Sequence, residues 1–160
     1  IAFDAIGAAR EGHHFLSVTK QGVSAIVTTA GNQACHIILR GGSGGPNYHA
    51  ESISKVATQL SEAGLAPYLM IDCSHGNSRK DYRRQPEVAK DLCAQLAGGS
   101  KAIAAVMVES NLVEGNQKLE EDPGALVYGQ SVTDACISWQ TTEGVLEGFA
   151  QAVKARRSHQ

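Results

Sequence analysis

Three short apolar runs, separated by helix-length stretches, constrain the fold of this chain more than any other feature. They cover residues 35–39, 68–71 and 103–108, and each is nearly continuous rather than alternating. A strand buried on both faces of a parallel sheet has this pattern, because neither face then meets water. The sequence therefore predicts an α/β fold with a parallel sheet.

The stretches that follow the runs have the spacing and end signals of amphipathic helices. Residues 50–63 place Ile53, Val56 and Leu60 on one face, and Gly64 can supply a left-handed C-cap. Residues 86–97 carry an apolar residue every four positions and end before two glycines. The last helix is predicted to begin near Thr141 or Thr142, and to bury a set of four apolar residues, Val145, Leu146, Phe149 and Val153.

The beginning of the chain has a different pattern. Residues 1–9 predict a helix with no strand before it. Two short apolar stretches, 15–18 and 25–28, flank Lys20-Gln21-Gly22, which is typical of a β-hairpin. We therefore expect one partial domain over residues 1–160, with a hairpin at about 14–29 added to βα units at about 35–160.

Composition excludes several classes of function. The chain has 14 Lys and Arg against 16 Asp and Glu, so no basic excess is available to neutralise nucleic-acid phosphates. The longest apolar run, 102–108, is too short to span a bilayer. Four scattered cysteines without a CxxC pair predict reduced thiols in a cytoplasmic protein. Because the chain begins at Ile1, we also expect a piece of a longer protein.

Chemically active residues follow each apolar run. Arg40 and two glycines follow the first run, His75 lies in the loop after the second, and Glu109 follows the third. Loops at the carboxyl ends of parallel strands converge on one face, so these three side chains should share a cleft. Asp134, shortly before the last helix, can join them.

This set of residues suits a metal and an anion. His75, Glu109 and Asp134 provide the nitrogen and oxygen ligands that Mn, Fe or Zn accept, and Arg40 could clamp a phosphate or carboxylate. Asp72 is expected to support a ligand rather than to be one. Structural alternatives remain open: a loop histidine, a solvated strand end, a helix cap and a structural ion pair.

Four motifs in this chain, in the same order, resemble those of the class I 3-deoxy-D-arabino-heptulosonate 7-phosphate (DAHP) synthases. They are CHIILRGG (35–42, with Pro46-Asn47-Tyr48 following), IDCSHGNS (71–78), VMVESNLVEGNQ (106–117) and YGQSVTDAC (128–136). Four ordered motifs are far more specific than one, and the resemblance covers essentially the whole chain.

The resemblance implies a TIM (β/α)₈ barrel enzyme that catalyses the first step of the shikimate pathway. It would condense phosphoenolpyruvate and erythrose 4-phosphate, with water, to DAHP and phosphate, using a divalent metal (Mn, Fe, Co or Zn). By motif, His75, Glu109 and Asp134 would be the catalytic metal ligands and Arg40 would bind phosphoenolpyruvate. The family also suggests a cytoplasmic homo-oligomer.

The departures from the family qualify what this chain can do. Only about three of eight βα units are present, which implies the C-terminal portion of the barrel, inactive without the N-terminal half. The family's fourth metal ligand is a cysteine on an early strand, and none of the four cysteines here lies in that motif.

The hairpin resembles the part of the family that carries the feedback site. Phe15, Ser17 and Val27 match positions that line the effector site of the phenylalanine-sensitive type, although packing within the hairpin would explain them equally well. For the chain as a whole, two further alternatives remain: a non-catalytic binding or assembly fragment, and a related phosphoenolpyruvate-condensing barrel that acts on another sugar.

Overall fold

The computed structural model describes residues 2–119 and 122–158. By its internal contacts the chain divides into two compact units, Ile1–Ile37 and Ile38–Gln160. The first unit contains helix α1 (Ala2–Arg10) and strands β1 (His14–Val18) and β2 (Ser24–Thr28). The two strands pair in an antiparallel manner, with Phe15 opposite Val27, which confirms the predicted hairpin.

A three-stranded sheet, in the order β3-β4-β5, forms the centre of the second unit, and its first strand begins at Ile37, the last residue of the first unit. Its strands are β3 (Ile37–Leu39), β4 (Leu69–Asp72) and β5 (Ile103–Met107), one within each predicted apolar run. Strands β4 and β5 are parallel, and Asp72 lies beside Met107. The carboxyl ends of these two strands are therefore level, and the loops that follow them start from the same edge.

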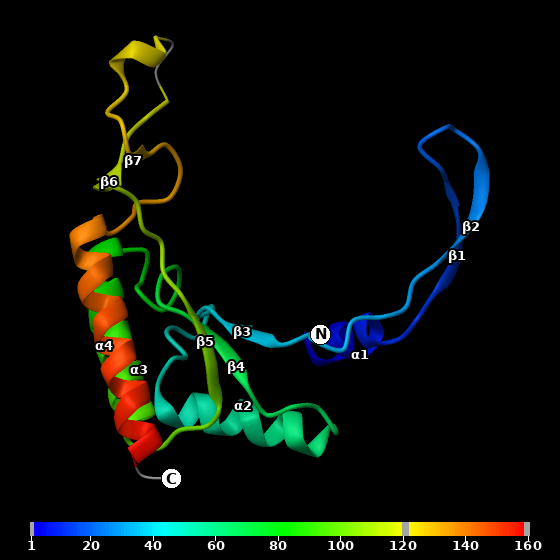
Figure 1. Ribbon diagram of the computed structural model, residues 1–160, viewed down its shortest axis with the longest axis horizontal. Helices are drawn as coiled ribbons and strands as arrows, with labels where there is room; N and C mark the ends of the chain where they lie inside the picture. The colour runs from blue at the N-terminus through cyan, green and yellow to red at the C-terminus, as the bar shows by residue number, and fades with distance from the viewer. Residues whose placement is uncertain (1, 120–121, 159–160) are drawn as a thin grey trace. The chain divides into compact units, whose positions relative to one another are not determined.

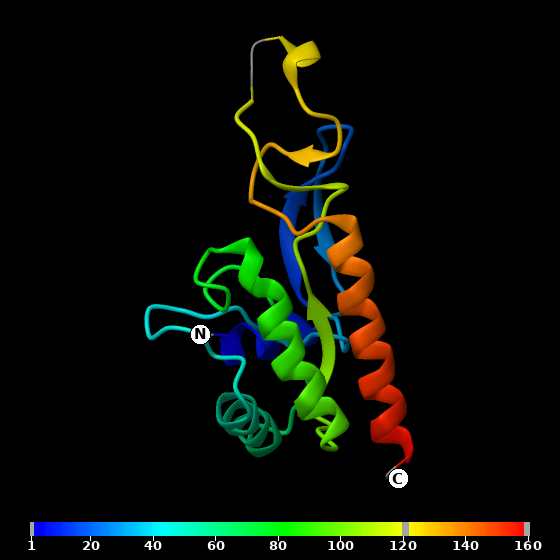
Figure 2. The ribbon, with the colours of Figure 1, turned by 90° about the vertical axis from the view of Figure 1, so that its left-hand side faces the viewer.

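The second unit also contains helices α2 (Ala50–Glu62), α3 (Gln85–Ala97) and α4 (Trp139–Ser158). Helices α3 and α4 lie side by side (Figures 1 and 2). The expected faces are buried in α2 at Ile53 and Leu60, and in α3 at Val88, Leu92 and Leu96. Gly64 has the left-handed φ of +69° that the sequence predicted. The mixed α/β fold with parallel strands is thus confirmed.

The last helix differs from its prediction in two ways. It begins at Trp139 rather than near Thr141, because the Ser138 hydroxyl accepts a hydrogen bond from the Thr141 N–H (3.2 Å) and caps the helix earlier. Leu146 is 51% exposed, although Val145 and Phe149 are buried as predicted. Leu146 lies one position around the helix from the buried face of α4, which follows Thr142, Val145, Phe149 and Ala152. The predicted Val153 lies beside this face and is half-buried.

The first apolar run is not buried on both faces within the described residues. In β3, Ile37 and Leu39 are buried, but Ile38 between them is 50% exposed. The prediction of two buried faces is wrong for this strand, because no further layer of the described chain covers its second face.

Two short parallel strands, β6 (Val113–Asn116) and β7 (Gln130–Ser131), were not predicted. Both views place them beyond the carboxyl end of β5 (Figures 1 and 2). Over residues 2–119 and 122–158, no helix combines the length and the apolar character needed to cross a bilayer.

Candidate metal centre

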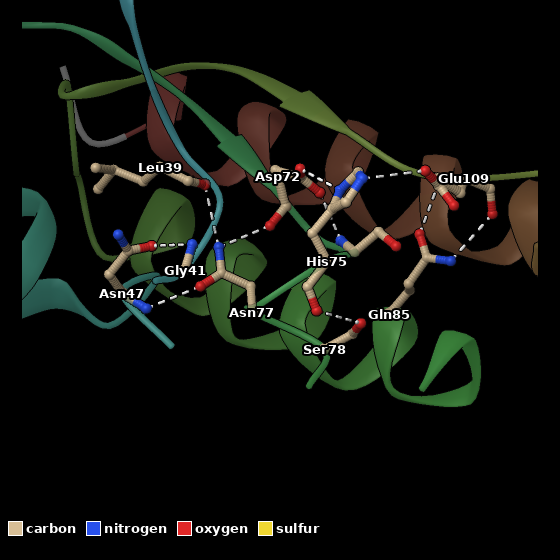
Figure 3. A network of polar contacts seen from close by, with 10 residues as sticks. Leu39, Gly41, Asn47, Asp72, His75, Asn77, Ser78, Gln85 and Glu109 are labelled. Carbon is tan, nitrogen blue, oxygen red and sulfur yellow. Dashed lines mark hydrogen bonds and ion pairs between the residues drawn. The ribbon is translucent and has the colours of Figure 1, made fainter. Parts of the chain in front are cut away.

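His75 lies in the turn that follows β4, and its ring is held by Asp72. Its Nδ1 is 2.7 Å from Asp72 Oδ2, and because a carboxylate only accepts, the ring donates its Nδ1 proton (Figure 3). The other Asp72 oxygen accepts from the Ser74 N–H at 2.7 Å. This arrangement leaves the Nε2 lone pair of His75 available, as in metal sites where a carboxylate orients a histidine. The supporting role predicted for Asp72 is consistent with this contact.

Glu109 follows β5 by two residues and faces His75. Its Oε1 lies 3.5 Å from His75 Nε2 (Figure 3). The side-chain amide of Gln85 makes two hydrogen bonds to the Glu109 backbone, and Gln85 is fully buried. Sequence reasoning missed Gln85, because no local pattern connects it to a residue 24 positions away.

Asp134 reaches the same place by way of a backbone pairing. The Ile137 N–H donates to the Glu109 carbonyl at 2.9 Å, and the Asn111 N–H donates to the Ile137 carbonyl at 3.0 Å. These bonds hold the 134–137 segment against the chain that follows β5. One ligand atom each of His75, Glu109 and Asp134 lies within 4.8 Å of the others, so the structure brings the three predicted residues together.

Burial, together with neighbouring negative charge, raises the pKa of the Glu109 carboxyl above its ordinary value of 4.5. Burial is the largest cause, followed by the Asp134 carboxylate, with a smaller contribution from Asp72. His75 and Arg40 act in the opposite direction and lower it. A bound cation would relieve the same repulsion, so this is the electrostatic character expected of a metal site.

Arg40 follows β3 directly and is exposed, and its positive charge has a small lowering effect on the pKa of Glu109. The turn at Arg40 packs tightly on the His75 turn. Gly41 has φ of +76°, and a Cβ there would lie 2.5 Å from the Gly76 carbonyl carbon. Only glycine fits this approach, so the two turns fix each other.

Asn77, another residue that sequence reasoning missed, ties these turns together. Its buried side chain donates to the carbonyls of Leu39 (3.1 Å) and Asp72 (2.7 Å) and accepts from the Asn47 N–H at 2.8 Å (Figure 3). It thereby connects the ends of β3 and β4 with the loop before α2.

A cavity of about 130 Å³ opens at the three candidate ligands. Its lining also includes Ser74, Lys80, Tyr82 and Ala135. Lys80 and Tyr82 were not predicted, although both lie within seven residues of His75 in the sequence. Two larger cavities, of about 610 and 380 Å³, are lined by described residues that include no histidine or carboxylate, so the chemistry favours the smaller one.

Within the described residues, the candidate metal group contains no cysteine. Burial, with help from the Asp72 charge, raises the pKa of the Cys73 thiol to about 12. Burial also raises the pKa of Cys136, whose Sγ donates to the Asp134 carbonyl at 3.5 Å. Both thiols therefore resist the deprotonation that metal binding requires.

The three residues predicted for effector binding lie in the first unit, on one face of the hairpin. Phe15 pairs with Val27, and Ser17 pairs with Ala25 two positions along the strand. Alternate positions of a strand point to the same side, so Phe15, Ser17 and Val27 share a face. The opposite face carries Leu16 and Ile26, both strongly exposed.

Glu109→Gln is expected to stabilise the metal-free chain near neutral pH and to remove its metal binding. A raised carboxyl pKa means that the folded state binds more protons than the unfolded state between pH 4.5 and the raised value, so stability falls as pH rises through this window. A neutral amide removes that loss. Urea unfolding at pH 5 and pH 7 checks this, with Glu87→Gln at an exposed α3 position as the control. A wild-type chain as stable at pH 7 as at pH 5, with no gain from Glu109→Gln, would contradict it.

Comparisons with known proteins give a consistent result. The family model described as the DAHP synthetase I family matches residues 1–147. The chain is 56% identical over 157 residues to a phospho-2-dehydro-3-deoxyheptonate aldolase of Haemophilus influenzae, covering 98% of this chain and 43% of that protein. It is 57% identical to the Phe-sensitive enzyme of that name from Escherichia coli K12, covering 98% and 44%.

A solved structure is also similar. The phospho-2-dehydro-3-deoxyheptonate aldolase of Francisella tularensis SCHU S4 matches with a TM-score of 0.88 at 48% identity, over 96% of this chain and 44% of that one. The chain thus spans less than half the length of the relatives that it matches.

Proposed function

This chain belongs to the DAHP synthetase I family, and on that premise we propose that it supplies part of the active site of a DAHP synthase. The whole protein would convert phosphoenolpyruvate, erythrose 4-phosphate and water into DAHP and phosphate, the first step of the shikimate pathway. The observation that carries the proposal is the meeting of His75, Glu109 and Asp134 within 4.8 Å at the carboxyl ends of the strands.

The proposed architecture is the C-terminal part of a TIM (β/α)₈ barrel, with residues 1–160 as one partial domain that includes the hairpin at about 14–29. The half-exposed Ile38 supports this. In a complete barrel, side chains from the other strands would cover this face of the apolar strand, and those strands are not part of this chain. The N-terminal half would provide those strands and the substrate-binding residues not present here. Homo-oligomer formation and a cytoplasmic location stay predictions.

The donor set fits a divalent metal ion. Ligand atoms bound to one ion at about 2.1 Å lie roughly 3 to 4 Å apart, so atoms within 4.8 Å of one another need only a small adjustment. One imidazole nitrogen and two carboxylate oxygens suit Mn, Fe, Co or Zn, without selecting among them. His75, Glu109 and Asp134 would hold the ion, and the missing half would complete its coordination.

When bound, the ion would act as a Lewis acid toward the aldehyde oxygen of erythrose 4-phosphate. Asp72 keeps the His75 ring oriented by accepting a hydrogen bond from its Nδ1–H. Arg40, which follows β3 directly, would hold the anionic groups of phosphoenolpyruvate through its two-pronged guanidinium. These residues would set the enol carbon against the aldehyde carbon, which lowers the entropic cost of the condensation.

The proposed bond changes balance with water as the third reactant. The C3 carbon of phosphoenolpyruvate forms a bond to the aldehyde carbon, whose oxygen becomes a hydroxyl. Water adds to the adjacent C2 carbon, and phosphate leaves with cleavage of the bond between C2 and its oxygen. One proton of the water ends on the new hydroxyl and the other leaves with the phosphate as C2 becomes a carbonyl. No redox step is involved, so the centre needs a Lewis acid, anion-binding groups and a route for these protons.

We extend the feedback property to this chain as part of the same proposal. The E. coli relative is named Phe-sensitive, and the shared face of Phe15, Ser17 and Val27 would contribute to a site for an aromatic amino acid. Residues outside this chain would complete that site.

Phosphate release from phosphoenolpyruvate and erythrose 4-phosphate tests the proposed function. The chain is assayed alone and after refolding with the part of the E. coli relative that it does not match, each with Mn²⁺ and with EDTA. We expect release only from the refolded pair, and its loss with EDTA. Activity of the chain alone would contradict the partial-site proposal, and a folded but inactive pair would contradict the assigned reaction.

A binding or assembly fragment is the second candidate, because apolar side chains such as Leu16, Ile26 and Ile38 are exposed. It predicts a folded, inactive pair and self-association of the chain. The third alternative, a related barrel acting on another sugar, predicts faster turnover of a different aldehyde.

A further inference from the structure

The side chain of Gln85, the first residue of α3, is fully buried. Burying an amide is costly unless its polar atoms find partners. Both partners belong to one residue: Nε2 donates to the Glu109 carbonyl at 3.1 Å, and Oε1 accepts from the Glu109 N–H at 2.7 Å (Figure 3). The amide therefore pairs with the backbone of Glu109 in the way that a neighbouring strand would.

Glu109 needs such a partner because the sheet no longer holds it. Strand β5 ends at Met107, and the ladder from β4 ends with the Cys73 N–H donating to the Met107 carbonyl. Beyond that point the Ile137 N–H also donates to the Glu109 carbonyl at 2.9 Å, but it leaves the Glu109 N–H without an acceptor. Gln85 supplies that acceptor.

The two hydrogen bonds fix the peptide groups on both sides of the Glu109 Cα. The direction of the Cα–Cβ bond is thereby set, and with it the path of the carboxylate toward His75 Nε2, 3.5 Å away. The amide itself is carried by a rigid element, since the next turns of α3 are anchored by the buried Val88 and Leu92.

We propose that Gln85 is a positioning residue of the metal centre, holding Glu109 in the geometry that binds the ion. This rests on the proposed function, because it assumes that Glu109 is a metal ligand. Gln85 does not touch the ion, and it acts only through the Glu109 backbone. A loose Glu109 would have to be ordered on binding, so the effect should appear as lower metal affinity.

Gln85→Met tests this, because it keeps the size of the side chain and removes both hydrogen bonds. The matched control is Gln95→Met on the same helix, where Nε2 donates to the Tyr48 carbonyl at 2.9 Å, away from the candidate ligands. Affinity of the chain for Mn²⁺ is measured by electron paramagnetic resonance, and exchange of the Glu109 amide by NMR. We expect Gln85→Met to weaken Mn²⁺ binding about 10- to 100-fold and to speed that exchange, while Gln95→Met leaves Mn²⁺ affinity unchanged.

The outcomes separate the two proposals. A wild-type chain that binds Mn²⁺ and a folded Gln85→Met variant with the same affinity would overturn the role of Gln85 alone. A wild-type chain that is folded and binds no Mn²⁺, either alone or in the refolded pair, would overturn the metal centre, and with it this role. If Gln85→Met does not fold, Gln85→Asn replaces it, because its shorter amide cannot span both backbone groups. We expect the same order of loss, and wild-type affinity in that variant would overturn the proposal.

Discussion

His75→Ala is expected to remove detectable Mn²⁺ binding from the chain and to lower the rate of phosphate release by the refolded pair roughly 1,000-fold, equivalent to about 4 kcal/mol of transition-state stabilisation. His75 is the only nitrogen donor of the group, and its Nε2 is left free because Asp72 occupies Nδ1. Its loss also leaves Glu109 and Asp134 as two neighbouring carboxylates without a third ligand.

The measurement combines Mn²⁺ titration with steady-state phosphate release at saturating substrate. His49→Ala is the matched control, because His49 is an exposed histidine of the same unit, and its Nδ1 lies 3.9 Å from Asp91 Oδ2 rather than at the candidate ligands. The control should retain both Mn²⁺ binding and rate. A His75→Ala variant with wild-type Mn²⁺ affinity would show that the ion, if bound, is held elsewhere.

The candidate ligands could be predicted from the sequence because their placement follows from topology. A parallel sheet places the ends of its strands at one edge, so residues directly after apolar runs must meet. His75 and Glu109 obey this rule, since Asp72 and Met107 are level in the β4–β5 register. Asp134 follows no strand of the main sheet, and its approach depends on the pairing of Ile137 with the chain at Glu109.

The residues that hold these ligands could not be predicted in the same way. Gln85 and Asn77 form hydrogen bonds to backbone groups 24 and 38 residues away. Every residue has a backbone carbonyl, so the sequence does not indicate which one a side chain will bind. A polar residue near a helix start has the same sequence appearance whether it is solvated or buried. The hydrogen-bond partners of such a residue depend on how the turns pack against each other, which only the three-dimensional structure shows.

Errors about burial have a related cause. The continuous apolar runs predicted strands covered on both faces, yet Ile38 is half exposed in the described chain. The same observation supports the proposed barrel, because the sequence retains a face that this chain alone does not cover. An apolar pattern predicts that a strand is suited to burial on both faces. Whether both faces are buried depends on which other segments are present to cover them.

Asn77→Ala is expected to cost the chain about 3 to 5 kcal/mol in its free energy of unfolding, the largest stability loss that we predict for a single side chain. This fully buried amide makes three hydrogen bonds. It donates to the Leu39 and Asp72 carbonyls and accepts from the Asn47 N–H. Truncation would leave the buried Leu39 and Asp72 carbonyls and the partly buried Asn47 N–H without this partner, at about 1 to 3 kcal/mol for each. Urea unfolding followed by circular dichroism measures the loss.

The control for this prediction is Asn116→Ala, which removes one exposed hydrogen bond to the Thr133 carbonyl and should change stability by less than about 1 kcal/mol. Asn77→Asp separates hydrogen bonding from packing, because it keeps the shape of the side chain. An ionised aspartate cannot donate a hydrogen bond. Its oxygen would lie against the Leu39 and Asp72 carbonyl oxygens, and these acceptors repel one another. We therefore expect Asn77→Asp to be at least as destabilising as Asn77→Ala at neutral pH. Near-wild-type stability of Asn77→Asp would contradict this, and would show that the packing of the side chain, rather than its donated hydrogen bonds, holds the two strand ends together.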